Sequence, residues 1–228
     1  MRRIAALAAT ACAVAATASP AGATNECHGL QVCVSIAGPW VVTPRTGVEF
    51  QLNCPRRFVV GGLDAELSDQ AIDVGFAGGL GAPVNPGITT SASAVFLGRF
   101  VGRGASATFR PHIGCIPASG GGQRTPTAYR VFKPGKPSVR VMKELTVSPG
   151  TRRFVVSCGA GRRLVRATHA VGFYTFTPPP AAVVADMQVQ QVVRANRVRI
   201  TVHAGPRFRS LPAVAAIVQV DLTCVAGT

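Results

Sequence analysis

The residues of this chain best suited to chemistry are cysteines that fall into a repeated pattern. Residues 40–54 and residues 145–158 both run through apolar residues, a Thr-Pro or Ser-Pro step, and a Phe placed four residues before a Cys. Each of these cysteines has a second Cys at nearly the same distance downstream, which gives the pairs Cys54–Cys115 and Cys158–Cys224. A matching period with matching cysteines predicts two similar domains of about 100 residues each.

The N-terminal residues predict export, which would place these cysteines in an oxidising compartment. Arg2 and Arg3 precede an apolar stretch over residues 4–18, and residues 21–23 (Ala-Gly-Ala) supply the small side chains of a signal-peptidase site. We expect residues 1–23 to be a cleaved signal peptide. A membrane anchor is the alternative, but the stretch is shorter than the roughly 20 residues that a span needs. The protein is therefore expected to be secreted or cell-surface associated, with no transmembrane segment in its mature chain.

Disulfide bonds are the chemistry that the cysteines favour. Cys12 leaves with the signal peptide, so an even number of cysteines remains. A zinc site or a catalytic thiol is the alternative, and the chain has no closely spaced Cys-x-x-Cys pair to support either. Six cysteines allow many pairings, and the equivalence of the two copies selects one. The predicted disulfides are Cys27–Cys33, Cys54–Cys115 and Cys158–Cys224.

Side chains for catalysis or metal binding are scattered. The chain has no Gly-x-Ser-x-Gly elbow, no His-Glu-x-x-His motif and no phosphate-binding loop motif, so we expect no enzyme and no cofactor. A small extracellular hydrolase built from distant residues is the least favoured alternative. Four neighbouring carboxylates could bind calcium, but they lack EF-hand spacing, and a solvated strand edge explains them better. They are Asp64, Glu66, Asp69 and Asp73.

Arginine supplies the strongest functional signal. The formal net charge is +15, and residues 145–228 hold ten arginines against two acidic residues. Strand alternation places Arg197 and Arg199 on one face, and Arg207 and Arg209 follow just beyond a Gly-Pro turn. Such a cluster attracts polyanions by Coulomb steering and counterion release. The alternative is compositional, because arginine far outnumbers lysine and Ala, Gly, Val and Pro abound, as a GC-rich genome would produce.

The elements that must position these residues are strands. Apolar and polar residues alternate over residues 48–52 and 198–202, which is the period of a half-buried strand. The 25 glycines and 17 prolines are spread along the chain as turn signals. Residues 181–193 fit a helix and a strand equally well. The sequence therefore predicts an all-β fold of two tandem immunoglobulin-like β-sandwiches, each stapled by one disulfide.

Changes in composition along the sequence indicate where the segments of the chain begin and end. A stretch with a Gly triplet, two Lys-Pro steps and no acidic residue separates the two copies and is typical of a linker. The predicted segments are the signal peptide (1–23), an N-terminal segment with a small disulfide loop (24–38), a first sandwich (39–117), the linker (118–138) and a second sandwich (139–228).

One stretch resembles a known kind of module. Cys54 opens the run Cys-Pro-Arg-Arg-Phe-Val-Val-Gly-Gly, which is similar to the Cys-Pro-x-Gly-x-x-x-x-Gly-Gly opening of exported bacterial β-modules whose closing strand ends in a second Cys. The copy that begins at Cys158 lacks the Pro and the Gly-Gly pair. These modules are largely uncharacterised. The resemblance therefore implies an exported β-module and carries over no catalytic or binding residue.

We predict an exported, non-catalytic binding or structural module of the cell envelope, whose basic second half contacts an anionic polymer. Specific nucleic-acid recognition is not expected, because the few aromatic residues are not interleaved with the arginines. The alternative is a carbohydrate- or protein-binding module that uses the long loop from Gly75 to Ser91, since loops at the ends of sandwiches often hold ligand sites.

Overall fold

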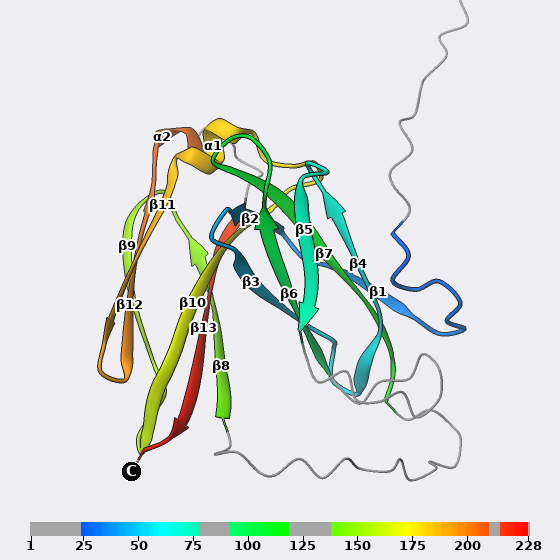
Figure 1. The fold of residues 1–228 in the computed structure, drawn as a ribbon, viewed down its shortest axis with the longest axis horizontal. Helices are drawn as coiled ribbons and strands as arrows, with labels where there is room; N and C mark the ends of the chain where they lie inside the picture. Colours follow the sequence, from blue (N-terminus) through cyan, green and yellow to red (C-terminus); the bar gives the residue numbers. More distant parts are fainter. Residues whose placement is uncertain (1–23, 78–91, 119–137, 210–214, 228) are drawn as a thin grey trace, which may run out of the picture.

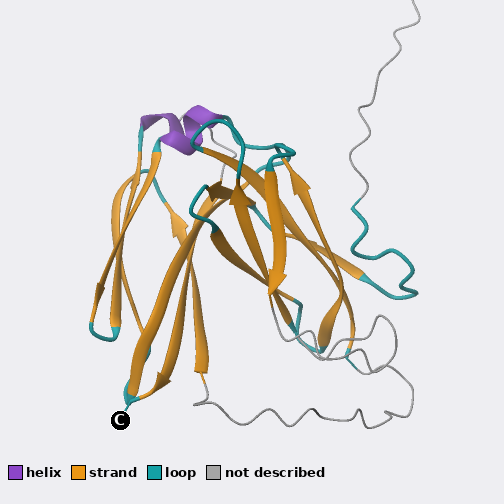
Figure 2. Cartoon of the chain, viewed as in Figure 1, coloured by secondary structure: helices purple, strands orange, loops and turns teal. Residues whose placement is uncertain are grey.

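The computed structural model describes residues 24–77, 92–118, 138–209 and 215–227, and most of these residues lie in β-strands (Figure 2). This confirms the all-β prediction. The helices of the described part are two short ones, α1 (Ala181–Ala185) and α2 (Pro206–Arg209). Within the described ranges, no helix has the length and apolar character needed to cross a bilayer.

The strands fall into two sets along the chain (Figure 1). The first half contributes β1 (Val34–Ala37), β2 (Trp40–Pro44), β3 (Val48–Asn53), β4 (Phe58–Leu67), β5 (Ile72–Ala77), β6 (Ser93–Phe100) and β7 (Ser106–Pro117). The second half contributes β8 (Ser138–Val147), β9 (Gly150–Ser157), β10 (Arg162–Tyr174), β11 (Met187–Arg194), β12 (Arg197–Ala204) and β13 (Ala215–Ala226).

Strand pairing follows the same scheme in both halves. The three-stranded sheets β3–β6–β5 and β9–β12–β11 have the same order, and β7 pairs with β2 and β4 as β13 pairs with β8 and β10. The correspondence extends to an irregularity. The register shifts between Val60 and Gly62 in β4, and between Leu164 and Arg166 in β10, at the same distance from the opening Cys of each half. The two halves thus share one scheme of strand pairing.

The two halves share one sheet. Strand β2 pairs with β10 through Trp40 opposite Phe173 and Val41 opposite Gly172, so that a seven-stranded sheet runs from β1 to β8. A Cβ at Gly172 would lie only 2.5 Å from the Pro39 ring, so a glycine is needed where the halves join. Residues 119–137 of the expected linker lie outside the described residues. The division into two immunoglobulin-like domains stays a prediction.

Each half has its own hydrophobic core, and each core is also contacted by side chains of the other half. Alternating burial directs one side of every three-stranded sheet inward, as in β12, where Val198, Ile200 and Val202 are fully buried. Ala170 and Ile217 of the second half pack into the first core. Val42 of the first half packs against the second core. The halves are therefore held together by packing as well as by strand pairing.

Three disulfides join the strands. They are Cys27–Cys33, Cys54–Cys115 and Cys158–Cys224, the pairs predicted from the duplication. The two long-range bridges occupy equivalent places, because Cys54 follows β3 and pairs with Cys115 in β7, whereas Cys158 follows β9 and pairs with Cys224 in β13. The short bridge closes a loop of the N-terminal segment, which lies against β7. A Cβ at Gly114 would come within 2.1 Å of the Glu26 carbonyl oxygen, so the glycine makes room for this segment.

Candidate functional site

The outer face of the sheet β9–β12–β11 carries a group of exposed arginines. In β12 the burial alternates strictly, with Arg197 and Arg199 exposed between buried neighbours. Residues directly opposite each other on paired antiparallel strands share a face. Arg194 of β11 lies opposite Arg197, and Arg153 of β9 lies opposite Thr201, so both join this face and both are exposed. We call these four residues the arginine face: Arg153, Arg194, Arg197 and Arg199.

The spacing of the arginine face follows from sheet geometry. Positions opposite each other on neighbouring strands lie about 5 Å apart, and alternate positions along one strand lie about 7 Å apart. Between the arginines stand Val192 and Val155, which flank Arg199 on its two neighbouring strands. The result is an open sheet surface on which charged and apolar side chains are mixed and which carries no Phe, Trp or Tyr residue.

The arginine face is not neutralised by the protein. None of its four guanidinium groups forms an ion pair or a side-chain hydrogen bond with any described residue, and the same three strands place no carboxylate on this face. Elsewhere, by contrast, Arg99 pairs with Asp73 at 3.2 Å and Arg140 with Glu49 at 3.4 Å. Four positive charges therefore remain available to an external partner.

The four arginines expected to bind a polyanion are only partly brought together. Arg197 and Arg199 lie on the arginine face. Arg207 lies in α2, beyond the opposite end of β12, where its backbone N–H donates to Asp186 at 2.9 Å. Arg209 also belongs to α2, and its side chain lies outside the description. A strand of this length separates its two ends by about 20 Å, so Arg207 is not part of the same patch as Arg197.

The carboxylates considered for calcium are dispersed. Asp64 accepts a hydrogen bond from the backbone of Asn25 at 2.6 Å, Asp69 accepts one from the backbone of Ala71 at 2.8 Å, and Asp73 pairs with Arg99. Glu66 lies beside His112. Within the described part of the chain, no three His, Cys, Asp or Glu residues are grouped closely enough to hold a metal ion.

The alternative binding loop, expected from Gly75 to Ser91, begins inside a strand. Gly75 at its start is part of β5, and residues 78–91 lie outside the described residues. Its role therefore stays a prediction.

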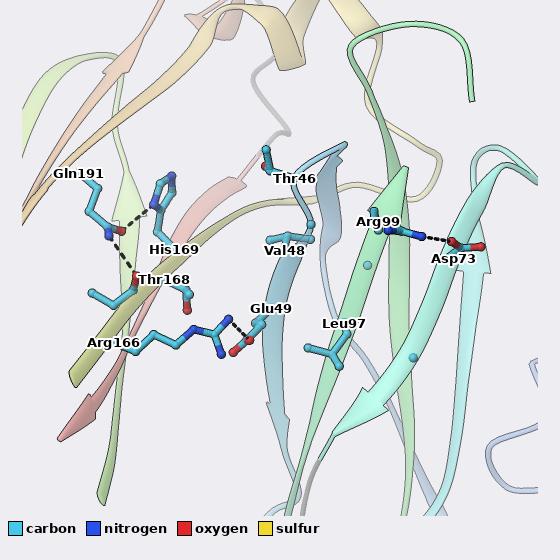
Figure 3. A pocket seen from close by; sticks show the side chains of 14 residues that line it. Thr46, Val48, Glu49, Asp73, Leu97, Arg99, Arg166, Thr168, His169 and Gln191 are labelled. Atoms are coloured by element: carbon cyan, nitrogen blue, oxygen red, sulfur yellow. Dashed lines mark hydrogen bonds and ion pairs between the residues drawn. The ribbon is translucent and has the colours of Figure 1, made fainter. Parts of the chain in front are cut away.

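A cleft that sequence reasoning missed lies between the two halves (Figure 3). Its volume is about 580 Å³, and it lies between β10 and β11 on one side and the outer face of β3–β6–β5 on the other. The polar side chains that line it are Thr46, Glu49, Asp73, Arg99, Arg166, Thr168, His169 and Gln191. Because these residues come from both copies, no local sequence pattern connects them.

Ion pairs between the two halves begin at two residues that line the cleft, Glu49 and Arg166. Glu49 pairs with Arg166 at 2.5 Å and with Arg140, which also pairs with Asp221. Burial raises the pKa of Asp221 above its usual value, and the hydrogen bond and charge of Arg140 oppose this only in part. The interface thus contains a network of two arginines and two carboxylates.

Gln219 fastens the edge strand β3 to the second half. Its side-chain oxygen accepts the backbone N–H of Gln51 at 2.7 Å, and its side-chain nitrogen donates to the backbone oxygen of Gln51 at 2.9 Å. Gln219 is only 1% exposed. Its amide therefore satisfies both backbone groups of an edge residue that no described strand pairs with on that side.

A second buried polar network holds the N-terminal segment. Glu26 is 3% exposed, and its Oε1 accepts hydrogen bonds from the hydroxyls of Ser35 and Thr24. Nδ1 of His112 lies 3.8 Å from the same oxygen, and Nε2 of His112 lies 2.8 Å from Glu66 Oε1. Burial alone would raise the pKa of Glu26, but the hydrogen bonds, led by that from Ser35, together with the nearby His112 hold it below its usual value.

No protein-family model, curated protein or solved structure matches this chain. Its two candidate surfaces are therefore interpreted from their own chemistry. The arginine face carries uncompensated charge, whereas the cleft contains charges that pair with one another.

Proposed function

We propose that this protein is an exported, non-catalytic module that associates with the cell envelope by binding an anionic polymer. The observation that carries the proposal is the arginine face, where four exposed guanidinium groups on three adjacent strands have no ion-pair partner in the described part of the chain. The three disulfides are compatible with an extracellular setting, because such bonds persist in oxidising compartments.

The arrangement suits an extended polyanion better than a compact ligand. A flat sheet face has no walls to enclose a small molecule, but it can contact several repeating charges of one chain. Each neutralised charge on a dense polyanion releases counterions, so binding of this kind weakens steeply as salt rises. The absence of aromatic residues on the face argues against a platform for stacked nucleic-acid bases.

Retention on immobilised heparin and on purified cell walls of the producing organism tests the proposal. The arginine-face variant replaces Arg153, Arg194, Arg197 and Arg199 with Gln. The matched control replaces Arg56, Arg103, Arg162 and Arg163 with Gln, which removes the same charge from exposed arginines without an ion pair among the described residues. Heparin and cell walls should both retain the wild type and the control to a higher salt concentration than the arginine-face variant. Equal loss of retention in both variants would show that net charge, and not the arginine face, accounts for binding.

A further inference from the structure

The cleft between the halves is built like a site for a small ligand rather than a polymer. Its volume of about 580 Å³ falls within the range usual for ligand pockets, and boundaries between packed units are common places for them. One wall comes from β10 and β11 and the other from β3, β5 and β6, as Figure 3 shows. Neither half alone forms it.

The charges inside the cleft cancel. Arg99 pairs with Asp73 and Arg166 pairs with Glu49, so the two cations and two anions among the lining residues are matched within the cleft itself. A small ion of either sign would have to displace an existing partner. The cleft therefore favours a neutral ligand, in contrast to the arginine face.

Several uncharged polar groups remain for such a ligand. The hydroxyls of Thr46 and Thr168 have no hydrogen-bond partner among the described residues. Gln191 is oriented by its side-chain nitrogen, which donates to the Ala167 carbonyl at 3.1 Å, so its oxygen faces Nδ1 of His169 at 2.8 Å. Because that oxygen can only accept, Nδ1 of His169 is the donor in this contact, and Nε2 has no hydrogen-bond partner among the described residues.

The floor of the cleft has a small apolar area. Leu97 of β6 lies opposite Gly75 of β5, and a Cβ at Gly75 would meet no atom closer than 4.0 Å, the Cβ of Leu97. The glycine thus leaves open space beside the leucine. A small apolar patch bordered by planar Arg, Asp, Glu and Gln groups matches a sugar ring, whose C–H face is apolar and whose neighbouring hydroxyls can bond two atoms of such a group at once.

We infer that this cleft binds a neutral saccharide of a few residues. A peptide fits less well, because apolar side chains of the lining are limited to Val48, Leu97 and Ala167, which leaves no deep pocket for side chains. Without an aromatic residue in the lining for stacking, the dissociation constant should be on the order of 1 mM. The inference does not rest on the arginine face, and either can fail alone.

Backbone amide chemical shifts of the oxidised protein during ligand titration test the inference. The probes are maltotriose, cellotriose and triacetylchitotriose, with acetyl-trialanine amide as the peptide comparison. At least one saccharide should shift the signals of Gly75, Thr168 and His169, with an affinity that is the same at low and moderate salt. No shift with any of the three saccharides, or a larger shift with the peptide, would overturn the inference.

Two variants locate the site. Gly75→Ile fills the open space beside Leu97 with a side chain that suits a strand and should weaken saccharide binding at least about tenfold. Thr168→Val keeps the shape, removes one hydroxyl and should weaken binding about threefold, so it remains informative if the first variant folds poorly. Thr146→Ile, an exposed change on β8 outside the lining, is the matched control and should bind as the wild type does. Unchanged affinity in both cleft variants would contradict the assignment. Retention of Gly75→Ile on heparin should be unchanged, which separates this site from the arginine face.

Discussion

The sheets β3–β6–β5 and β9–β12–β11 hold equivalent places in the two halves, yet their outer faces differ in charge. The first displays Glu49, Asp73 and Arg99, which are all engaged in ion pairs, and part of it lines the cleft against β10. The second displays the arginine face, for which the described residues supply no counter-charge. The two halves thus share their strand scheme and their long-range disulfides. They differ in whether the charged side chains of the outer face form ion pairs with other described residues.

Removal of the long-range disulfides, which occupy equivalent places in both halves, should lower the free energy of unfolding more than any other change considered. The bridges Cys54–Cys115 and Cys158–Cys224 span 61 and 66 residues, so the chain-entropy model gives each about 4 kcal/mol. Replacing either pair with alanine should lower the free energy of unfolding by that amount, measured by urea denaturation. The short bridge Cys27–Cys33 should matter less, about 2 kcal/mol. A large difference between the two long bridges would show that the halves are not energetically equivalent.

The next effect concerns an equivalent position that has diverged. Gln219 and Arg110 lie at the same distance before the closing Cys of their halves. Gln219→Leu should cost about 2 kcal/mol, because it leaves both backbone groups of Gln51 without a partner. Arg110→Met should cost about 1 kcal/mol, because the arginine is partly exposed and its main loss is a hydrogen bond to the Gly38 carbonyl. Urea denaturation that gave equal costs would contradict the role of Gln219 in joining the halves.

Ion pairs on the first sheet should differ according to what they connect. Glu49 is 16% exposed and contacts two arginines of the second half, so Glu49→Gln should cost about 1 kcal/mol. The pair of Asp73 with Arg99 is more than 60% exposed on both sides and lies within one sheet, so Asp73→Asn should cost less than about 0.5 kcal/mol. A larger loss of unfolding free energy for Asp73→Asn than for Glu49→Gln, measured by urea denaturation, would contradict this distinction.

The smallest expected effect is a pH dependence of stability that comes from Glu26, in the N-terminal segment that only the first half carries. The pKa of Glu26 is lowered in the folded state, so the unfolded chain takes up the proton first as the pH falls. The stabilisation from its carboxylate is therefore complete above the usual Glu pKa of about 4.3 and is lost as the pH falls through the lower folded value. Unfolding free energies of the wild type and Glu26→Gln should differ most at neutral pH and converge in acid. A constant difference would show that the charge of Glu26 contributes nothing.

Much of the framework was predictable because it depends on local pattern. Alternation placed Arg197 and Arg199 outward, and the duplicated cysteines gave the three disulfides. The ambiguous residues 181–193 divide between α1 and β11, since a short helix and a strand share that stretch.

The sites were harder to predict because they depend on register and on contacts between the halves. Arg194 and Arg153 join the arginine face only through the alignment of three strands, which the sequence pattern does not reveal. Arg166 is one of the ten arginines that make the second half basic, yet it pairs with Glu49 of the first half. The four carboxylates from Asp64 to Asp73 are close in sequence but are divided between β4, a turn and β5.

The salt dependence of heparin affinity tests the central claim most directly. The slope of the logarithm of affinity against the logarithm of salt concentration counts the charges that bind the polyanion. For the variant with Arg153, Arg194, Arg197 and Arg199 replaced by Gln, the slope should be shallower by about one unit for each arginine that contacts heparin. The control variant at Arg56, Arg103, Arg162 and Arg163 should keep the wild-type slope. An arginine-face variant with the wild-type slope would show that the polyanion binds elsewhere, or that the charge of this face is compositional.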